Sequence, residues 1–430
     1  MRNFILFSII IFAIISCNVN EEDLLNPDFT LIPSEKFLFK SFVDCNMAEA
    51  WIGDTFRIFP GKYGEDPEWG YAHELKFASG HNADEVFLTE SNKFTEPSMP
   101  PNVSIGQSGL HGAVWFETIY QKPEDATGKT LYAIYHNENY PSTLPYNFNT
   151  GEGYIDSLWP QGITGVHSKA AVCRIGVMKS IDGGHSWQNK GLFIEDLQSR
   201  MILKPHNNSL CFAGGVGDPS AVASGEYLYL FYGEYGYPSI YQINNYDSVF
   251  EHNGQCISVA RIKLSDLDDP QGKALRWSGN KFINPYNGNG RPILSLQIPK
   301  EEGGGATSKR RGQFHWGPSV SWNSYLNCWV MLMGKVEDYS WVGSSIYISF
   351  NKHKDLGKGT NSQDWTKPKI ILDKPGHVIW YPSLQPMNTK EDIQEKRTCL
   401  KLGKKARLFF KDMVEGNAQY ISEYIIEFEK

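Results

Sequence analysis

The sequence has little excess charge, and basic residues are not in surplus. Its 41 lysines and arginines face 48 aspartates and glutamates, giving a net charge of -7 and a pI near 5.9. Such a chain has no excess of cations to neutralise phosphates, so we expect no nucleic-acid partner. Hydrophobic residues make up 41% of the chain, which is typical of a globular protein and argues against a polytopic membrane protein.

Several motifs that would specify a chemistry are missing. The seven cysteines show no C-x-x-C spacing, which argues against a zinc ribbon or a thioredoxin-like site. The chain has no H-E-x-x-H, no G-x-S-x-G and no glycine-rich loop ending in Gly-Lys-Ser/Thr. We therefore expect no cofactor and assign no metal ligands, although an ion on the axis of the fold stays open.

Long helical periodicity is also missing between residues 40 and 430. Short alternating or aromatic runs occur instead, in a chain with 12 Trp, 22 Tyr, 24 Phe, 40 Gly and 23 Pro. Aromatic strands joined by Gly and Pro turns predict an all-β fold.

The N-terminus predicts an export signal. Arg2 precedes an apolar stretch over residues 4–15, which is too short to span a bilayer and fits a signal-peptide core. Ser16 and Cys17 follow, and this arrangement resembles a bacterial lipobox whose cysteine is lipidated. The acidic run over residues 18–23 resembles the surface-export signal of Bacteroidetes lipoproteins. We expect a signal peptide over residues 1–16, a lipidated tether over 17–36, and an outer-membrane lipoprotein exposed at the cell surface.

A repeated tripeptide predicts the architecture of residues 37–430. Asp218-Pro219-Ser220, Gly317-Pro318-Ser319 and Tyr381-Pro382-Ser383 each precede a short strand, a turn and a strongly apolar second strand. Further strands follow, and four antiparallel strands per unit is the pattern of a propeller blade. Two more blades are expected in the N-terminal half, the first with strands over 37–43, 49–56, 74–77 and 85–89. The prediction is a five-bladed β-propeller of four-stranded antiparallel blades.

One hairpin carries an Asp box. Ser180, Asp182, Gly184, Ser186 and Trp187 match S-x-D-x-G-x-[ST]-W. The aspartate of such a box accepts hydrogen bonds within the turn and the tryptophan packs between strands, so we expect Asp182 to be structural.

Polar residues near the starts of first strands and the ends of second strands should converge on one end of a propeller axis. The expected catalytic carboxyls are Asp44, Asp54, Glu138, Asp218 and Glu234, of which only one of Asp44 and Asp54 is expected in the site. The expected substrate-binding residues are His111, His136, His315, Trp316, Trp380 and Tyr381. Aromatic rings stack on sugar faces, and cleavage of a glycosidic bond requires two carboxyl groups.

With these residues in place, the chain resembles five-bladed propeller glycoside hydrolases, namely families 43, 32 and 117 and the endo-D-arabinanase type. The resemblance is carried by residues 51–56, by Gly217-Asp218-Pro219 and by the later Pro-Ser blade starts. It implies an extracellular hydrolase of polysaccharides or oligosaccharides. It also implies Asp44 or Asp54 as base or nucleophile, Glu138 or Glu234 as acid, and Asp218 as the orienting residue.

Two alternatives stay open. A surface glycan-binding lipoprotein would keep the aromatic residues without a working acid pair. A sialidase-like enzyme would fit the Asp box, but it needs arginines for a substrate carboxylate, and the nearest candidates are Arg57, Arg291 and Arg311.

Overall fold

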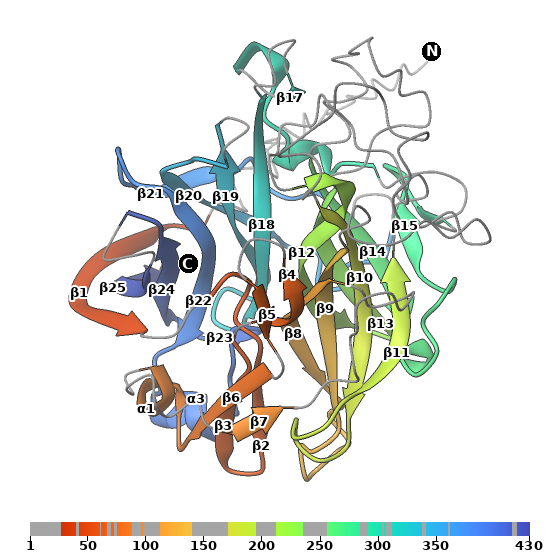
Figure 1. Cartoon of the computed structure of the whole chain (residues 1–430). Helices are drawn as coiled ribbons and strands as arrows, with labels where there is room; N and C mark the ends of the chain where they lie inside the picture. Colours follow the sequence, from red (N-terminus) through yellow and green to blue (C-terminus); the bar gives the residue numbers. More distant parts are fainter. Residues whose placement is uncertain are drawn as a thin grey trace, which may run out of the picture.

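A computed structural model describes residues 27–39, 43–60, 62–66, 70–72, 75–87, 96–98, 112–139, 171–194, 212–234, 256–283, 291–302, 305–306, 312–337, 341–359, 362–414 and 419–430. These residues form five blades of four antiparallel strands, with short extra strands at some edges and one short parallel pairing that joins two neighbouring blades into a single sheet (Figure 1). The expected signal peptide and Cys17 lie outside the described residues. Among the described residues, no helix is both long and apolar enough to cross a bilayer.

In each blade the first strand lies innermost. Blade I is β2 (Glu49–Ile52), β3 (Thr55–Ile58), β6 (Leu75–Gly80) and β7 (Glu96–Ser98). Blade II is β8 (Ala113–Gln121), β9 (Leu131–Asn139), β10 (Ala171–Ser180) and β11 (Gln188–Ile194). Blade III is β12 (Phe212–Ser224), β13 (Tyr227–Glu234), β14 (Cys256–Lys263) and β15 (Leu275–Trp277), extended by β16 (Phe282–Ile283).

Blades IV and V complete the ring. Blade IV is β18 (Gly312–Asn323), β19 (Cys328–Val336), β20 (Ser345–Asn351) and β21 (Lys369–Asp373). Blade V is β22 (Ile379–Pro386), β24 (Lys405–Asp412), β25 (Gln419–Phe428) and β1 (Phe29–Phe39). Because the first strand of the chain pairs with the last, the two ends of the chain close the ring in one sheet.

The remaining elements are short. Strands β4 (Lys62–Asp66) and β5 (Gly70–Ala72) extend blade II, whereas β17 (Gly305–Ala306) and β23 (Lys401–Leu402) pair with β18. Within the described residues, the α-helices are α1 (Ala83–Phe87) and α3 (Lys390–Gln394), and the 3-10 helices are η6 (Leu264–Asp266), η8 (Leu294–Leu296) and η9 (Lys300–Glu302).

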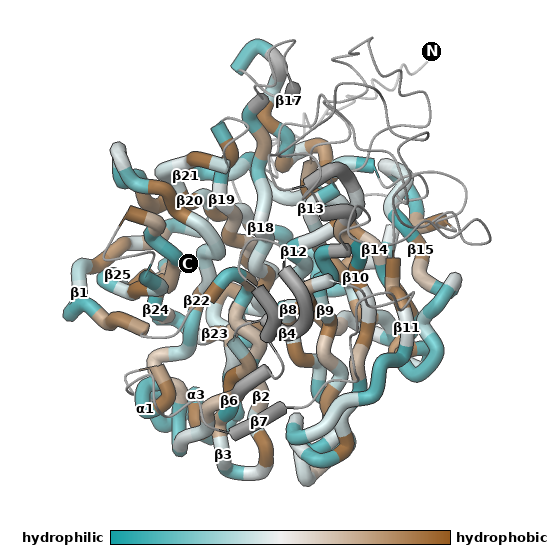
Figure 2. Tube along the Cα trace, viewed as in Figure 1, coloured by the Kyte–Doolittle hydropathy of each residue, from teal (hydrophilic) through white to brown (hydrophobic). Residues whose placement is uncertain are grey.

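The hydrophobic core is divided among the blade interfaces. Phe59 and Phe116 belong to a cluster between blades I and II, Ile134 and Leu228 to one between II and III. Three further clusters join III to IV, IV to V, and V back to I. Figure 2 shows hydrophobic residues along the strands and hydrophilic residues in many of the turns. A ring with a cluster at every interface is the packing of a five-bladed propeller, as the repeats predicted.

Blade I corrects the predicted boundaries. Residues 37–39 end β1, which belongs to blade V and begins at Phe29, so the propeller starts before residue 37. Residues 49–56 are two strands joined by a turn at Gly53, whose φ of 59° suits glycine. The stretch predicted as the fourth strand contains the end of α1, and β7 supplies that strand instead.

The repeated tripeptides mark bulges inside the inner strands, and the strands begin earlier. Asp218, Gly317 and Tyr381 have φ values of 48°, 58° and 47°, and the strand register shifts at each. Such left-handed backbone bends a strand and redirects its side chains. In β8 the register shifts at Glu117. The bulges thus recur at comparable places around the axis.

Candidate functional site

Three titratable side chains meet at the axis. Glu117 comes from β8, His136 from β9 and Asp218 from the bulge of β12. His136 Nδ1 lies 3.6 Å from Glu117 Oε1 and 3.6 Å from Asp218 Oδ1. All three residues are at most 2% exposed. We call these three residues the axial cluster.

Residues from the other blades hold the axial cluster in place. The backbone N–H of Asn46, just before β2, donates to Glu117 Oε2 at 2.7 Å. The Asn46 side chain donates to the carbonyl oxygens of Pro219 and Pro318, both at 3.3 Å. Tyr381 Oη donates to Asp218 Oδ1 at 3.2 Å. Every inner strand therefore has a residue in, or close to, one polar network.

Burial and proximity change the protonation of the axial cluster. The pKa of Glu117 is raised to about 7, mainly by burial; His136 opposes the rise and the charge of Asp218 adds to it. Burial lowers the pKa of His136, but Cys173, Asp218 and Glu117 outweigh it, so that this pKa lies well above its usual range. Burial raises the pKa of the Cys173 thiol to about 12, so this thiol is neutral at pH 7. The carboxylates are therefore the groups that stabilise an imidazolium here.

The axial cluster is also where an axial ion would bind. One ligand atom from each of Glu117, His136 and Asp218 lies within 4.8 Å of the others. Imidazole and carboxylate together suit several divalent cations. The sequence left this possibility open, and these three residues are the donors it would use.

Another carboxyl, outside the axial cluster, lies at the same end of the axis. The inner strands begin at this end, which we call the mouth. Asp44 precedes β2 and is two residues from Asn46. Its Oδ1 accepts a hydrogen bond from Lys411 Nζ at 2.7 Å. The Asp44 side chain is 24% exposed, whereas that of Lys411 is 1% exposed. Asp44 is thus an accessible carboxylate with a buried cationic partner.

Aromatic rings lie beside the Lys411 ammonium group that pairs with this carboxylate. Lys411 Nζ lies 5.3 Å from the centroid of the Trp380 ring, and Trp380 Nε1 donates to the Trp341 carbonyl at 2.8 Å. The Trp316 ring lies edge-on to those of Trp341, Trp380 and Tyr381, at centroid distances of 4.9, 6.0 and 5.3 Å. Trp380 is partly exposed and the other three are buried. Trp380 is therefore the ring most available to a ligand.

Glu138 also lies toward the mouth. It follows His136 by two residues on β9, so both side chains are on one face of the strand. Both Glu138 and Asp218 contribute to the raised pKa of the Cys173 thiol, which places the three residues in one neighbourhood. Glu138 is partly exposed. It is therefore an acidic side chain that solvent reaches beside the axial cluster.

Two expected carboxyls lie elsewhere. Asp54 is fully exposed in the β2–β3 turn, at the end of the axis away from the mouth, and its nearest cation is Lys396 at 3.6 Å. Glu234 is buried within blade III, where Arg276 Nη1 lies 3.7 Å away and Tyr232 Oη donates to it at 3.4 Å. Between Asp44 and Asp54, the structure brings only Asp44 near the axial cluster.

The expected histidines differ in their surroundings. His136 belongs to the axial cluster, as described. His315 is buried, and its Nδ1 lies 2.6 Å from the Leu296 carbonyl oxygen. Burial lowers the pKa of His315 to about 4, so that this ring is neutral at pH 7. His111 lies outside the described residues.

Sequence reasoning missed Glu117 and Lys411. Glu117 stands within the apolar run of β8, and Lys411 follows Leu408, Phe409 and Phe410 in β24. A charged residue inside an apolar strand was the available signal, because such a residue is buried only when it is paired.

The sialidase alternative loses one of its arginines. Arg57 donates to the Gly183 carbonyl within the Asp-box turn and to Ser79 Oγ at 2.9 Å. Arg291 is exposed, and Arg311 lies outside the described residues. Arg57 therefore has a structural role at the Asp-box end of blades I and II.

Comparisons with known proteins give only distant likenesses. No family model matches the sequence, and no curated protein matches it. Among solved structures, the chain is similar to an exo-1,5-alpha-L-arabinanase from a bovine ruminal metagenomic library, with a TM-score of 0.43, 11% identity, and 91% and 93% of the two chains covered. It is also similar to a GH43 endo-arabinanase from Bacillus licheniformis, with a TM-score of 0.40, 10% identity, and 91% and 96% covered.

A third likeness concerns a different reaction. An N-acetylgalactosamine deacetylase from F. plautii gives a TM-score of 0.43, 11% identity, and 93% and 95% of the chains covered. Likenesses at this level do not assign a reaction, so the reaction is argued from the side chains at the mouth.

Proposed function

We propose that this chain is a glycoside hydrolase that cleaves glycosidic bonds of a polysaccharide or oligosaccharide at the propeller mouth. The observation that carries the proposal is the accessible Asp44 carboxylate, paired with Lys411 beside Trp380. Trp380 offers a ring for stacking on the apolar face of a sugar. Asp44 offers a carboxylate whose partner, Lys411, also contacts that ring.

In the proposed reaction, the two carboxyl groups have different roles. Glu138 donates a proton to the leaving glycosidic oxygen, because it is the other partly exposed acid among those near the axial cluster. Asp44 acts on the opposite side of the bond, either on the anomeric carbon or by taking a proton from water. Asp218 and His136 orient the site through the contacts of the axial cluster.

The decisive experiment compares Asp44→Asn and Glu138→Gln with Asp54→Asn on a broad panel of glycans. We expect the first two to lower turnover by about 10³-fold, because each removes a charge or proton that the reaction uses, while sugar affinity is largely kept. Asp54→Asn is the matched control, because Asp54 belongs to the same blade and is exposed at the other end. Wild-type turnover in Asp44→Asn would contradict the proposal.

A non-catalytic glycan-binding protein is the second candidate. The burial of Glu117 and Asp218, at 1% and 0% exposed, favours it, because it leaves fewer carboxyls for chemistry. Purified protein that retains oligosaccharides but releases no reducing ends from any glycan of the panel would support binding alone.

We also propose that the protein is exported and anchored to the outer membrane through Cys17, at the cell surface. The support is the apolar stretch and the Ser16-Cys17 pair of the sequence. Metabolic labelling with a palmitate analogue tests this proposal. Cys17→Ser should lose both the label and the membrane fraction, and a labelled Cys17→Ser protein would overturn it.

A further inference from the structure

Lys411 occupies an unusual place for a lysine. It lies in β24, the second strand of blade V, after three apolar residues, and its side chain is 1% exposed. An amino group taken out of water is costly unless a charged partner accepts its hydrogen bonds. Asp44 Oδ1, at 2.7 Å, is such a partner.

The ion pair also crosses the seam of the ring. Asp44 precedes the inner strand of blade I, whereas Lys411 pairs through its backbone with Trp380 of β22 and Tyr420 of β25, both in blade V. The same ammonium group lies 5.3 Å from the centroid of the Trp380 ring. Lys411 therefore contacts both the carboxylate and the ring that the proposed function assigns to the substrate.

The charged groups next to Lys411 and Asp44 in the sequence have partners of their own. The next residue, Asp412, faces the other side of β24 and accepts hydrogen bonds from His377 Nδ1 at 2.8 Å and from Lys374 Nζ at 3.1 Å. On the blade I side, the Asn46 backbone leads to Glu117 and the rest of the axial cluster. Asp44 thus pairs with Lys411 of blade V, and Asn46, two residues further along the chain, contacts the axial cluster of blades II and III.

We propose that Lys411 is the positioning residue of the site: it holds the Asp44 carboxylate charged and aimed at the sugar bound on Trp380. This inference rests on the proposed function. A carboxylate must stay ionised to act as nucleophile or base, and a cation at hydrogen-bond distance favours the ionised form. The hydrogen bond from Lys411 also limits the rotation of the Asp44 side chain.

The test uses the full chain with Lys411→Met, Lys411→Arg and Lys405→Met. Lys405 begins the same strand but is exposed and pairs with Glu427 at 2.9 Å, so Lys405→Met is the matched control. At pH values below 7, we expect kcat of Lys411→Met to be about 10- to 100-fold lower than that of the wild type, with KM nearly unchanged. The acidic limb of the pH–rate profile should move up by about one pH unit. Lys411→Arg should keep most of the wild-type kcat and the wild-type position of the acidic limb. Lys405→Met should match the wild type in both quantities.

A second measurement does not depend on turnover. The Asp44 carboxyl can be followed by NMR in protein labelled with ¹³C-aspartate and assigned by its loss in Asp44→Asn. We expect it to titrate at higher pH in Lys411→Met than in the wild type. Equal titration would overturn the role of Lys411, even in an active enzyme. If the wild type shows no turnover on any glycan but the titration of Asp44 shifts in Lys411→Met, the proposed function is wrong. The effect of Lys411 on the Asp44 charge then still stands.

Discussion

Tyr381 donates a hydrogen bond to Asp218 across the propeller axis, and both residues have left-handed backbones. The Oη to Oδ1 distance is 3.2 Å, and the φ values are 47° and 48°. Each residue precedes a proline, which normally favours an extended conformation at that position. Non-glycine residues adopt such strained backbones mainly where the surroundings enforce them, and they cluster at functional sites. The left-handed backbone therefore orients the Asp218 and Tyr381 side chains so that they meet at the axis.

The hydroxyl of Tyr381 should matter for activity as well as for stability. Tyr381→Phe keeps the ring packed on Trp316 and removes one hydrogen bond to a carboxyl, which is worth about 1.5–3 kcal/mol. We expect turnover to fall about 10-fold or more, because Asp218 is no longer held. Tyr135→Phe is the control, since Tyr135 Oη donates to Asn189 at 3.2 Å in blade II. Equal turnover in the two variants would argue against an orienting role for Asp218.

The repeats predicted the blades well because each copy carries its own local signals. Pro-Ser bulges and apolar second strands recur within blades III, IV and V. Blade I lacks them, and its Gly53 turn lies inside a stretch that reads as one strand. The pairing of β1 with β25 joins opposite ends of the chain, and no local pattern encodes it.

Some residues of the candidate site could likewise be predicted from local patterns, and others could not. Asp218, His136, Trp380 and Tyr381 could be placed because the propeller template puts strand starts and strand ends at one mouth. Lys411 could not, because its partner Asp44 lies 367 residues away in the sequence. Glu234 has the pattern of a mouth residue, but the cation of Arg276 within its own blade pairs with it.

Glu49 should make stability depend on pH. Burial raises its pKa to about 8, and the Cys399 N–H that donates to Oε2 at 2.7 Å only partly offsets this. The folded state therefore keeps a proton that the unfolded state, with a pKa near 4.5, has released. The contribution of this group to the free energy of unfolding is fully present below pH 4.5. It is lost as the pH rises toward 8, and the loss is on the order of 4 kcal/mol.

Glu49→Gln tests that assignment, because the amide stays neutral and its oxygen still accepts the Cys399 N–H. We expect the variant to unfold at a higher urea concentration than the wild type at pH 8.5, and at a similar one at pH 4.5. Glu226→Gln is the control, since Glu226 is exposed in the turn before β13. A difference between Glu49→Gln and the wild type that is constant with pH would refute the protonated Glu49.

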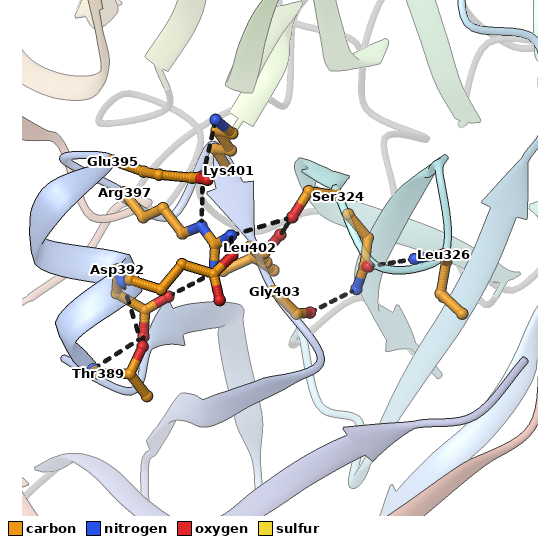
Figure 3. Close-up of polar contacts among 11 residues, drawn as sticks. Ser324, Leu326, Thr389, Asp392, Glu395, Arg397, Lys401, Leu402 and Gly403 are labelled. Carbon is orange, nitrogen blue, oxygen red and sulfur yellow. Dashed lines mark hydrogen bonds and ion pairs between the residues drawn. The ribbon is translucent and has the colours of Figure 1, made fainter.

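Arg397 should be essential for stability at the end of the propeller away from the mouth. Its guanidinium contacts Glu391, Asp392 and Glu395 at 2.5, 2.7 and 3.0 Å, with 3% of the side chain exposed (Figure 3). Its carbonyl accepts from Trp51 Nε1 of blade I at 3.0 Å, so it joins blades V and I. Arg397→Met leaves the nearly buried Asp392 without this cation, and we expect a loss of about 3–5 kcal/mol in chemical denaturation.

The Arg397 variant also separates stability from chemistry. Because Arg397 lies away from the mouth, folded Arg397→Met protein should keep the wild-type KM and kcat at low temperature. Lys396→Met, which removes a 45% exposed neighbour, should cost less than about 1 kcal/mol. A variant as stable as the wild type would mean that the four charged groups contribute no net stability.

The Asp box should behave as a structural turn. Asp182 accepts hydrogen bonds from the Ser186 N–H at 3.0 Å, from Ser186 Oγ at 2.5 Å and from Ser180 Oγ at 2.7 Å. These bonds fix the turn so that the Trp187 ring packs at 4.7 Å from Phe116 in the cluster between blades I and II. Asp182→Ala removes the acceptor of all three hydrogen bonds, and we expect a loss of about 2–3 kcal/mol in the free energy of unfolding. Turnover per folded molecule should be unchanged, since the turn lies at the end away from Asp44. A loss of turnover without a loss of stability would move the reaction to the Asp-box end and exclude the mouth.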